Sequence, residues 1–137
     1  MLGYRSFDCR NNLRFDKSDQ IIYHQAALGM VLSPSKKSGG AEFNQTFLSE
    51  HKDDITCLDN MGDTIVTGEC GTTPMIVIWN TKNIVDGAIK SDMIITKKLK
   101  DSVGTVCFSP SGNYLAATCN DEDHTLVIYD LKVLKEL

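Results

Sequence analysis

Two stretches of the sequence decide the fold: TIVTGECGTTPMIVIWNTK at residues 64–82 and YLAATCNDEDHTLVIYDLK at residues 114–132. They align without a gap at an offset of 50, so that Ile65 matches Leu115 and Trp79 matches Tyr129. Upstream the offset falls to 48, because the second copy has two more residues in its turn. Each copy predicts strand, turn, strand, turn, strand, longer loop and strand, which is a four-stranded antiparallel unit repeated in tandem.

Short apolar segments, separated by turn-forming residues, continue this pattern along the whole chain. Most are rich in Ile, Val, Thr, Tyr and Trp, which fit a pleated and half-buried surface. We expect strands at residues 20–26, 28–32, 43–48, 55–59, 64–68, 75–79, 93–99, 103–108, 114–118 and 125–129. The polar segments 35–41 and 81–92 are the best candidates for long exposed loops. The fold class is therefore all-β.

A four-stranded sheet of this size cannot bury both of its faces alone. Radial stacking of such sheets buries them against one another, which is the physical basis of a β-propeller. A closed ring takes at least four blades, and this sequence supplies two clear copies with a degenerate one before them. We expect a propeller fragment that does not close a ring alone, with the remaining blades in the same or another chain. Its unpaired strand edges predict association or aggregation of the isolated chain.

Composition narrows the class of protein. The 137 residues carry a net charge of −4, with 42% hydrophobic and 23% charged positions, as in one ordinary globular unit. No apolar run reaches the length of a membrane helix, and no basic run predicts binding to nucleic acid or to a membrane surface. The first residues have no apolar core of signal-peptide length, so we expect a cytoplasmic protein whose five cysteines are reduced.

Two phrases, FSPSGNYLAATCNDEDHTLVIYD at 108–130 and MIVIWN at 75–80, resemble WD-repeat signatures. In that family a His, a Ser or Thr, an Asp and a Trp form a hydrogen-bonded network within each blade. In the first copy the resemblance implies His51, Thr67 and Trp79 as members, with Thr73 where the Asp would lie.

The second copy departs further from the WD-repeat pattern. The resemblance implies Asp123 in the turn and Tyr129 in the Trp position, while Leu99 and Ala117 replace the His and the hydroxyl. Neither network is complete. We therefore expect blade stability to depend more on apolar packing than on this polar network.

The N-terminal stretch GYRSFDCRNNLRF at 3–15, followed by QIIYHQAALGMVL at 20–32, resembles the HELP motif of the echinoderm microtubule-associated protein-like (EMAP-like) family. HKDDITCL at 51–58 continues the likeness into the first full blade. The matching motif positions are Gly3, Tyr4, Arg5, Asp8, Cys9, Arg10, Asn12 and Leu13.

This resemblance implies an order of parts and a role. Residues 1–50 correspond to the HELP motif and a partial blade, 51–100 to a WD-repeat blade, and 101–137 to a truncated WD-repeat blade. In the EMAP-like family the HELP segment contributes strands that help seal a pair of propellers, whose faces bind tubulin.

The charged residues of the motif allow two interpretations. Arg5, Asp8 and Arg10 form either a charge cluster that faces a partner or an Arg–Asp pair that attaches the segment to the propeller core.

Lysines are the other candidates for partner contact, and they either touch an acidic partner or are solvated groups that block aggregation of a strand edge. The lysines concerned are Lys36, Lys37, Lys97, Lys98 and Lys100.

Catalytic and metal-binding chemistry find no support in the sequence. No CxxC or HxxxH spacing occurs, so a zinc site is not expected. Cys57 and Cys107 lie in apolar strands and are expected to be inert core residues. Because no phosphate-cradling glycine loop or GxSxG elbow is present, we predict neither an enzyme nor a cofactor.

Our first functional hypothesis is a non-catalytic, rigid scaffold that binds tubulin or a microtubule-bound assembly, located on cytoplasmic microtubules or in a ciliary axoneme. The alternative is a general WD-repeat scaffold for protein partners with no tubulin contact.

Overall fold

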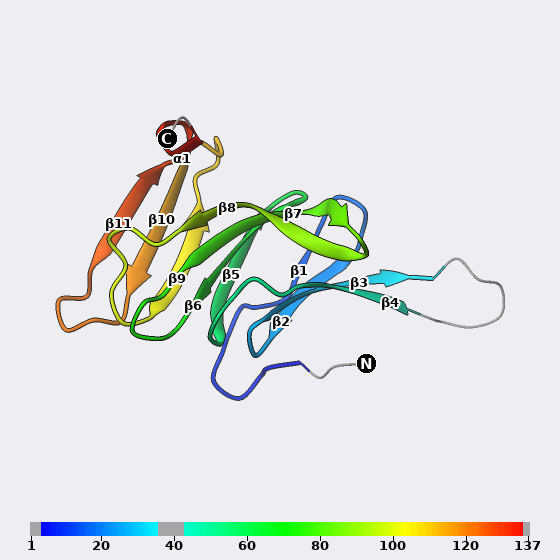
Figure 1. Cartoon of the computed structure of the whole chain (residues 1–137), viewed down its shortest axis with the longest axis horizontal. Helices are drawn as coiled ribbons and strands as arrows, with labels where there is room; N and C mark the ends of the chain where they lie inside the picture. The colour runs from blue at the N-terminus through cyan, green and yellow to red at the C-terminus, as the bar shows by residue number, and fades with distance from the viewer. Residues whose placement is uncertain (1–3, 36–42, 136–137) are drawn as a thin grey trace.

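The computed structural model describes residues 4–35 and 43–135 (Figure 1). Within these residues the chain is almost entirely β-structure, with one five-residue helix at the end. The elements are β1 (Arg14–Phe15), β2 (Ile21–Gln25), β3 (Leu28–Pro34), β4 (Phe43–Leu48), β5 (Ile55–Met61), β6 (Thr64–Glu69), β7 (Ile76–Val85), β8 (Ala88–Ile95), β9 (Val103–Phe108), β10 (Tyr114–Cys119), β11 (Leu126–Asp130) and α1 (Leu131–Lys135).

The strands form three antiparallel units. An eight-stranded sheet has the order β1-β2-β3-β4-β8-β7-β6-β5, and a three-stranded sheet has the order β11-β10-β9. The larger sheet consists of two four-stranded units joined edge to edge, because β4 pairs with β8 in parallel and only at Leu48 and Ile89. Each unit follows the chain order of a propeller blade, and the whole is a fragment of a β-propeller.

The two sequence copies have the same strand register. Ile65 pairs with Trp79 in β6 and β7, and Leu115 pairs with Tyr129 in β10 and β11. The offset of 50 residues therefore relates equivalent places in the two sheets. Repetition in the sequence corresponds to repetition in space.

The unit β5–β8 is buried on both faces. Successive residues of β7 point to opposite sides, and all four residues from Ile76 to Trp79 are buried. One face packs on the β9–β11 sheet, in a core that includes Ile76, Val106 and Leu115. The other packs on strands β2 to β4, in a core that includes Trp79. Figure 1 shows β5–β8 between the other two units, as in the stacking of propeller blades.

No residue that the structure describes covers the outer face of β9–β11. Val127 and Tyr129 point into the core, while Leu126 and Ile128 on the opposite face are 63% and 64% exposed. Cys107 shares this exposure, so its prediction as a core residue was wrong, whereas Cys57 is buried as expected. The error arose because an apolar strand at the end of a stack has only one covered face.

The segment 81–92 is not the loop that its polar composition predicted. Strand β7 continues to Val85, and β8 begins at Ala88. Asp86 and Gly87 connect them with φ values of 51° and 79°, the conformation of a two-residue hairpin turn. The other expected loop, 35–41, falls almost entirely outside the described residues.

The single described helix, α1, is far too short and polar to cross a membrane, and the described residues contain no candidate membrane-spanning helix.

Candidate functional site

A buried polar network lies in the β5–β8 unit. His51 Nε2 is 2.7 Å from Thr67 Oγ1, and the indole Nε1 of Trp79 donates to the same oxygen at 3.2 Å. On the other side of the ring, His51 Nδ1 is 2.8 Å from Glu69 Oε2. Because a carboxylate only accepts, Nδ1 carries the proton, and Nε2 accepts from the Thr67 hydroxyl. The sequence prediction brought together His51, Thr67 and Trp79, and the structure places them in contact.

Glu69 completes this network, which sequence reasoning missed. Its Oε2 also accepts from the backbone N–H of Lys52 at 3.0 Å. Thr73, which was expected in the carboxylate position, is exposed in the β6–β7 loop. The missing signal was the period of two along a strand, since Thr67 and Glu69 lie on one face of β6. Burial lowers the pKa of His51, and the Glu69 carboxylate opposes this effect.

The β9–β11 unit replaces this network by separate contacts. Tyr129, in the Trp position, donates from its hydroxyl to the backbone carbonyl of Lys97 at 2.6 Å. Burial raises the pKa of Tyr129 to about 12. Ala117 is buried, and Leu99 packs against the core.

In the turn of this unit, the carboxylate that forms the hydrogen bonds belongs to Asp121 and not to Asp123, which the resemblance had implied. Asp121 accepts from the Thr125 backbone N–H at 2.8 Å and from its hydroxyl at 2.6 Å. These hydrogen bonds hold the pKa of Asp121 below its usual range. Asp123 is exposed and lies 3.5 Å from Lys100.

The HELP-like segment, residues 4–13, lies against the β2–β3 hairpin and the start of β5. Arg5 binds Asp8 through Nε at 2.7 Å and reaches Asp54 through Nη1 at 2.9 Å. The Arg5 guanidinium holds the pKa of Asp8 at about 2. Of the two interpretations of this cluster, the contacts of Arg5 favour attachment to the propeller.

Hydrogen bonds within the segment fix its shape. The Tyr4 hydroxyl donates to Asn12 Oδ1, and Asn12 Nδ2 donates to the Arg5 carbonyl at 2.8 Å. The Tyr4 ring packs on the Tyr23 ring of β2, with centroids 6.3 Å apart. Cys9 is buried and Leu13 is half exposed. Gly3 lies outside the described residues.

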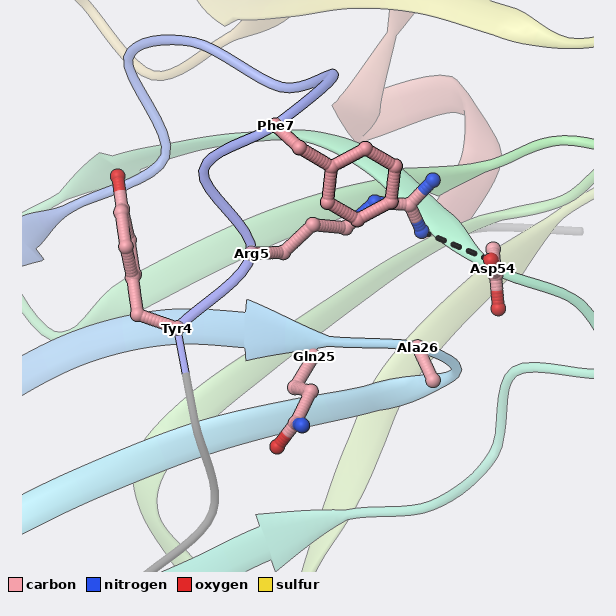
Figure 2. Close-up of a pocket in the computed structure, with 6 residues that line it drawn as sticks. All are labelled: Tyr4, Arg5, Phe7, Gln25, Ala26 and Asp54. Atoms are coloured by element: carbon pink, nitrogen blue, oxygen red, sulfur yellow. Dashed lines mark hydrogen bonds and ion pairs between the residues drawn. The ribbon is translucent and has the colours of Figure 1, made fainter.

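A shallow cavity of about 280 Å³ opens beside this segment (Figure 2). Figure 2 shows the Phe7 ring lying across the Arg5 side chain, with Gln25 and Ala26 at the turn that ends β2. The Arg5 guanidinium carbon is 5.4 Å from the Phe7 ring centroid, and Phe7 is 80% exposed. An exposed aromatic ring on a fixed guanidinium suits contact with another protein.

The candidate lysines lie apart from this cavity. Lys97 and Lys98 are exposed, and neither forms an ion pair with any residue that the structure describes. Lys100 is 3.7 Å from Asp121. Lys36 and Lys37 fall in the part of the chain that the structure does not describe. Among the described residues, no three His, Cys, Asp or Glu side chains form a group that could hold a metal ion.

Comparison with known proteins agrees with these features. The family model described as "HELP motif" matches residues 2–30, and the model described as "WD domain, G-beta repeat" matches residues 94–130. The ciliary WD repeat-containing protein ctxp80 of Euplotoides octocarinatus is 31% identical over 94% of the chain. Echinoderm microtubule-associated protein-like 2 of Homo sapiens is 31% identical over 93% of the chain. Echinoderm microtubule-associated protein-like 1 of Rattus norvegicus is 28% identical over 93%.

The chain spans only part of these relatives, namely 19% of the ciliary protein, 20% of the human protein and 16% of the rat protein. The similarity nevertheless runs through all three β-units, from the HELP motif into the WD repeat. The chain contains a HELP motif and a WD repeat, and it is homologous over nearly its whole length to part of members of the echinoderm microtubule-associated protein-like family.

Proposed function

We propose that the chain is a non-catalytic interaction module of a microtubule-associated protein, and that it binds tubulin or a microtubule-bound assembly as a rigid scaffold. One observation carries the proposal: the HELP segment is attached to the blades by the Arg5–Asp54 ion pair and by the tilted packing of the Tyr4 ring against Tyr23 of β2. This attachment leaves Phe7 exposed on a fixed support. Preformed surfaces of this kind lose little conformational entropy when they bind.

The names of the relatives support the place of action. One is described as ciliary and others as microtubule-associated. We propose the same setting, on cytoplasmic microtubules or in a cilium, for the protein that contains this chain. We also propose its division into a HELP motif with a partial blade at 1–50 and two WD-repeat blades at 51–100 and 101–137.

Co-sedimentation with microtubules across a salt series tests this function. The full-length protein is expected to sediment with microtubules, with binding that weakens as salt rises because exposed charges are screened. The 137-residue chain is assayed beside it. Sedimentation of both places the contact on this chain. Failure of the full-length protein to sediment at low salt would reject the microtubule proposal.

The unpaired lysines supply the first variants. The double variant Lys97→Gln, Lys98→Gln is compared with Lys132→Gln, which removes another exposed charge, from α1. If the lysines contact an acidic partner, only the double variant weakens sedimentation, by several-fold at low salt. Equal binding by the two variants would assign these lysines to the solvated surface.

A second candidate function is a general WD-repeat scaffold for protein partners without tubulin contact. The pairing of Lys100 with Asp121 and Asp123 favours it, because this ion-paired cation is less available to an acidic partner. Recovery of other partners by a full-length protein that does not sediment would support this alternative.

A further inference from the structure

A second cavity, of about 320 Å³, lies between the HELP segment and the first strands of the two WD-repeat units. Residues 8–11 and Arg14 line one side, and residues of β5 and β9 line the other. β5 and β9 are edge strands of different sheets that approach each other, and the Thr56 hydroxyl of β5 donates to the Val103 carbonyl of β9. The cavity is therefore built from all three parts of the chain, and its volume falls in the range of ligand pockets.

Arg10 brings an unneutralised positive charge to this cavity. Its Nη1 donates to the backbone carbonyls of Ser6 and Cys9, at 2.9 and 3.1 Å. No carboxylate among the described residues forms an ion pair with it. Its Nε and Nη2 donate to none of these residues, so three of its five N–H groups are free to bind a ligand. The two carbonyls hold the guanidinium in place, which lowers the entropic cost of using those groups.

Arg14 adds a second guanidinium. Its Nη1 donates to the Asn11 carbonyl at 2.8 Å and to the Asn11 side chain at 2.9 Å. Its nearest carboxylate, that of Asp59, is 3.8 Å from Nε. The Asp59 carboxylate accepts a hydrogen bond from the Phe108 backbone N–H at 2.9 Å and is too far from Arg14 Nε for a hydrogen bond to it.

The carboxylate that lines the cavity is already engaged. Asp8 is bound by Arg5 through both of its oxygens. The charged residues that line the cavity are Arg10, Arg14 and Asp8, so the lining has one more positive than negative charge, although the whole chain has a net charge of −4. Because Asp8 and Asp59 are ion-paired with Arg5 and Arg14, Arg10 is the lining charge that no described carboxylate pairs.

The opposite wall supplies apolar surface. Cys57, Leu58 and Val106 line it, and all three are largely buried in the two blades. The hydroxyl of Thr56 is used within the protein, by the Val103 carbonyl. A side chain that fits this cavity has methylene groups that pack on the apolar wall and a carboxylate that accepts hydrogen bonds from the guanidinium groups. Glutamate has both.

We propose that this cavity binds a glutamate-bearing segment of a protein partner, with Arg10 as the principal carboxylate ligand and Arg14 beside it. The inference rests on the proposed interaction function but requires no microtubule. It assigns Arg10 of the HELP motif to partner recognition, while Arg5 and Asp8 attach the segment to the blades.

Fluorescence polarisation with a labelled hexaglutamate peptide tests the proposal on the full chain. The wild-type chain is expected to bind hexaglutamate and not hexaglutamine. Arg10→Gln removes a charge-assisted fork and is expected to weaken binding about tenfold. Arg10→Lys, which keeps the charge but loses the fork, is expected to fall between the two. Lys132→Gln is the matched control, and thermal unfolding verifies that each variant is folded.

Two results would overturn the proposal. One is equal affinity of folded Arg10→Gln and wild-type chains for hexaglutamate. The other is equal binding of hexaglutamate and hexaglutamine by the wild type. If the chain binds hexaglutamate through Arg10 but does not sediment with microtubules, the cavity proposal stands and the microtubule function is rejected. If the chain sediments with microtubules but Arg10→Gln leaves peptide binding unchanged, the cavity proposal alone is rejected.

Discussion

Thr67 is the residue on which the buried network of the β5–β8 unit depends. Its hydroxyl oxygen lies between the indole N–H of Trp79 and the Nε2 of His51. All three side chains are buried, so water cannot replace a lost partner. The cost of losing this hydroxyl is the cost of leaving buried polar groups unsatisfied.

We predict that Thr67→Val, which preserves the shape of the side chain, lowers the unfolding free energy by about 1–3 kcal/mol. Thr73→Val is the control, because Thr73 is exposed, and it should change stability by no more than about 0.5 kcal/mol. Urea denaturation of the full chain measures both. An equal loss in the two variants would mean that the network adds no stability.

His24 is a second buried residue with a particular energetic role. It is fully buried in β2, and neither ring nitrogen has a hydrogen-bond partner among the described residues. Burial lowers its pKa to about 4, with smaller effects from Arg5, Asp8, His51 and Asp54 nearby. Between about pH 4 and the unperturbed pKa of about 6.5, the unfolded chain therefore binds more protons than the folded chain at this site.

Stability is accordingly predicted to fall as the pH decreases from 6.5 to 4, by up to about 1.4 kcal/mol per pH unit from His24. His24→Phe should reduce this dependence by the share of His24 and leave the part of the same sign that comes from His51, whose pKa burial also lowers. Unfolding midpoints at a series of pH values provide the measurement. A wild-type chain with constant stability across this interval would contradict the assignment.

At the scale of elements, the β7–β8 hairpin shows why some segments escape sequence reasoning. Residues 81–92 are polar because half of the hairpin projects into solvent, and Ile84 and Val85 are exposed. Composition alone therefore predicts a loop. The Asp-Gly pair at 86–87 was the local signal of a tight hairpin turn, and it outweighs composition because it fixes the backbone conformation.

We predict that Gly87→Ala destabilises this hairpin by about 1 kcal/mol. A Cβ at Gly87 would meet no atom within 4 Å, so the cost is only that of a positive φ for alanine. Asp86→Asn is the matched variant, because asparagine tolerates the same conformation, and it should be neutral. Hydrogen exchange of the β7 and β8 amides is the measurement, and equal protection in the two variants would refute the argument.

The strands themselves were more predictable than their connections. Short apolar segments rich in Ile, Val, Thr, Tyr and Trp, separated by turn-forming residues, located nine of the expected strands near their observed positions, because both signals are local in the sequence. The expected strand at 93–99 is instead the end of β8 and the loop after it, where Lys97 and Lys98 are exposed. The cavity beside Arg10 was not predictable, since it depends on how β5 and β9 approach in space.

At the scale of the whole molecule, the outer face of β9–β11 is exposed to solvent within the described part of the chain. Leu126 and Ile128 point outward beside the half-exposed Tyr114. A stacked sheet whose last face is apolar and exposed is expected to associate with another apolar face.

We predict that the isolated chain self-associates as its concentration rises, and that the double variant Leu126→Lys, Ile128→Lys reduces this association. Lysine on the exposed face introduces charge without entering the core. Size-exclusion chromatography with light scattering distinguishes the states, and Val133→Lys, on α1, serves as the control. A wild-type chain that stays monomeric at all concentrations would contradict the prediction.

Because β5–β8 is buried on both faces, its two faces are covered at different times during translation. A ribosome releases β2 to β4 before this unit, so the face around Trp79 can be covered as soon as Ile95 has emerged. The opposite face, around Ile76, remains exposed to solvent until β9 to β11 and Leu131 have also been synthesised. During that interval the nascent chain presents a finished sheet with one apolar side open, which is the kind of surface that holding chaperones protect.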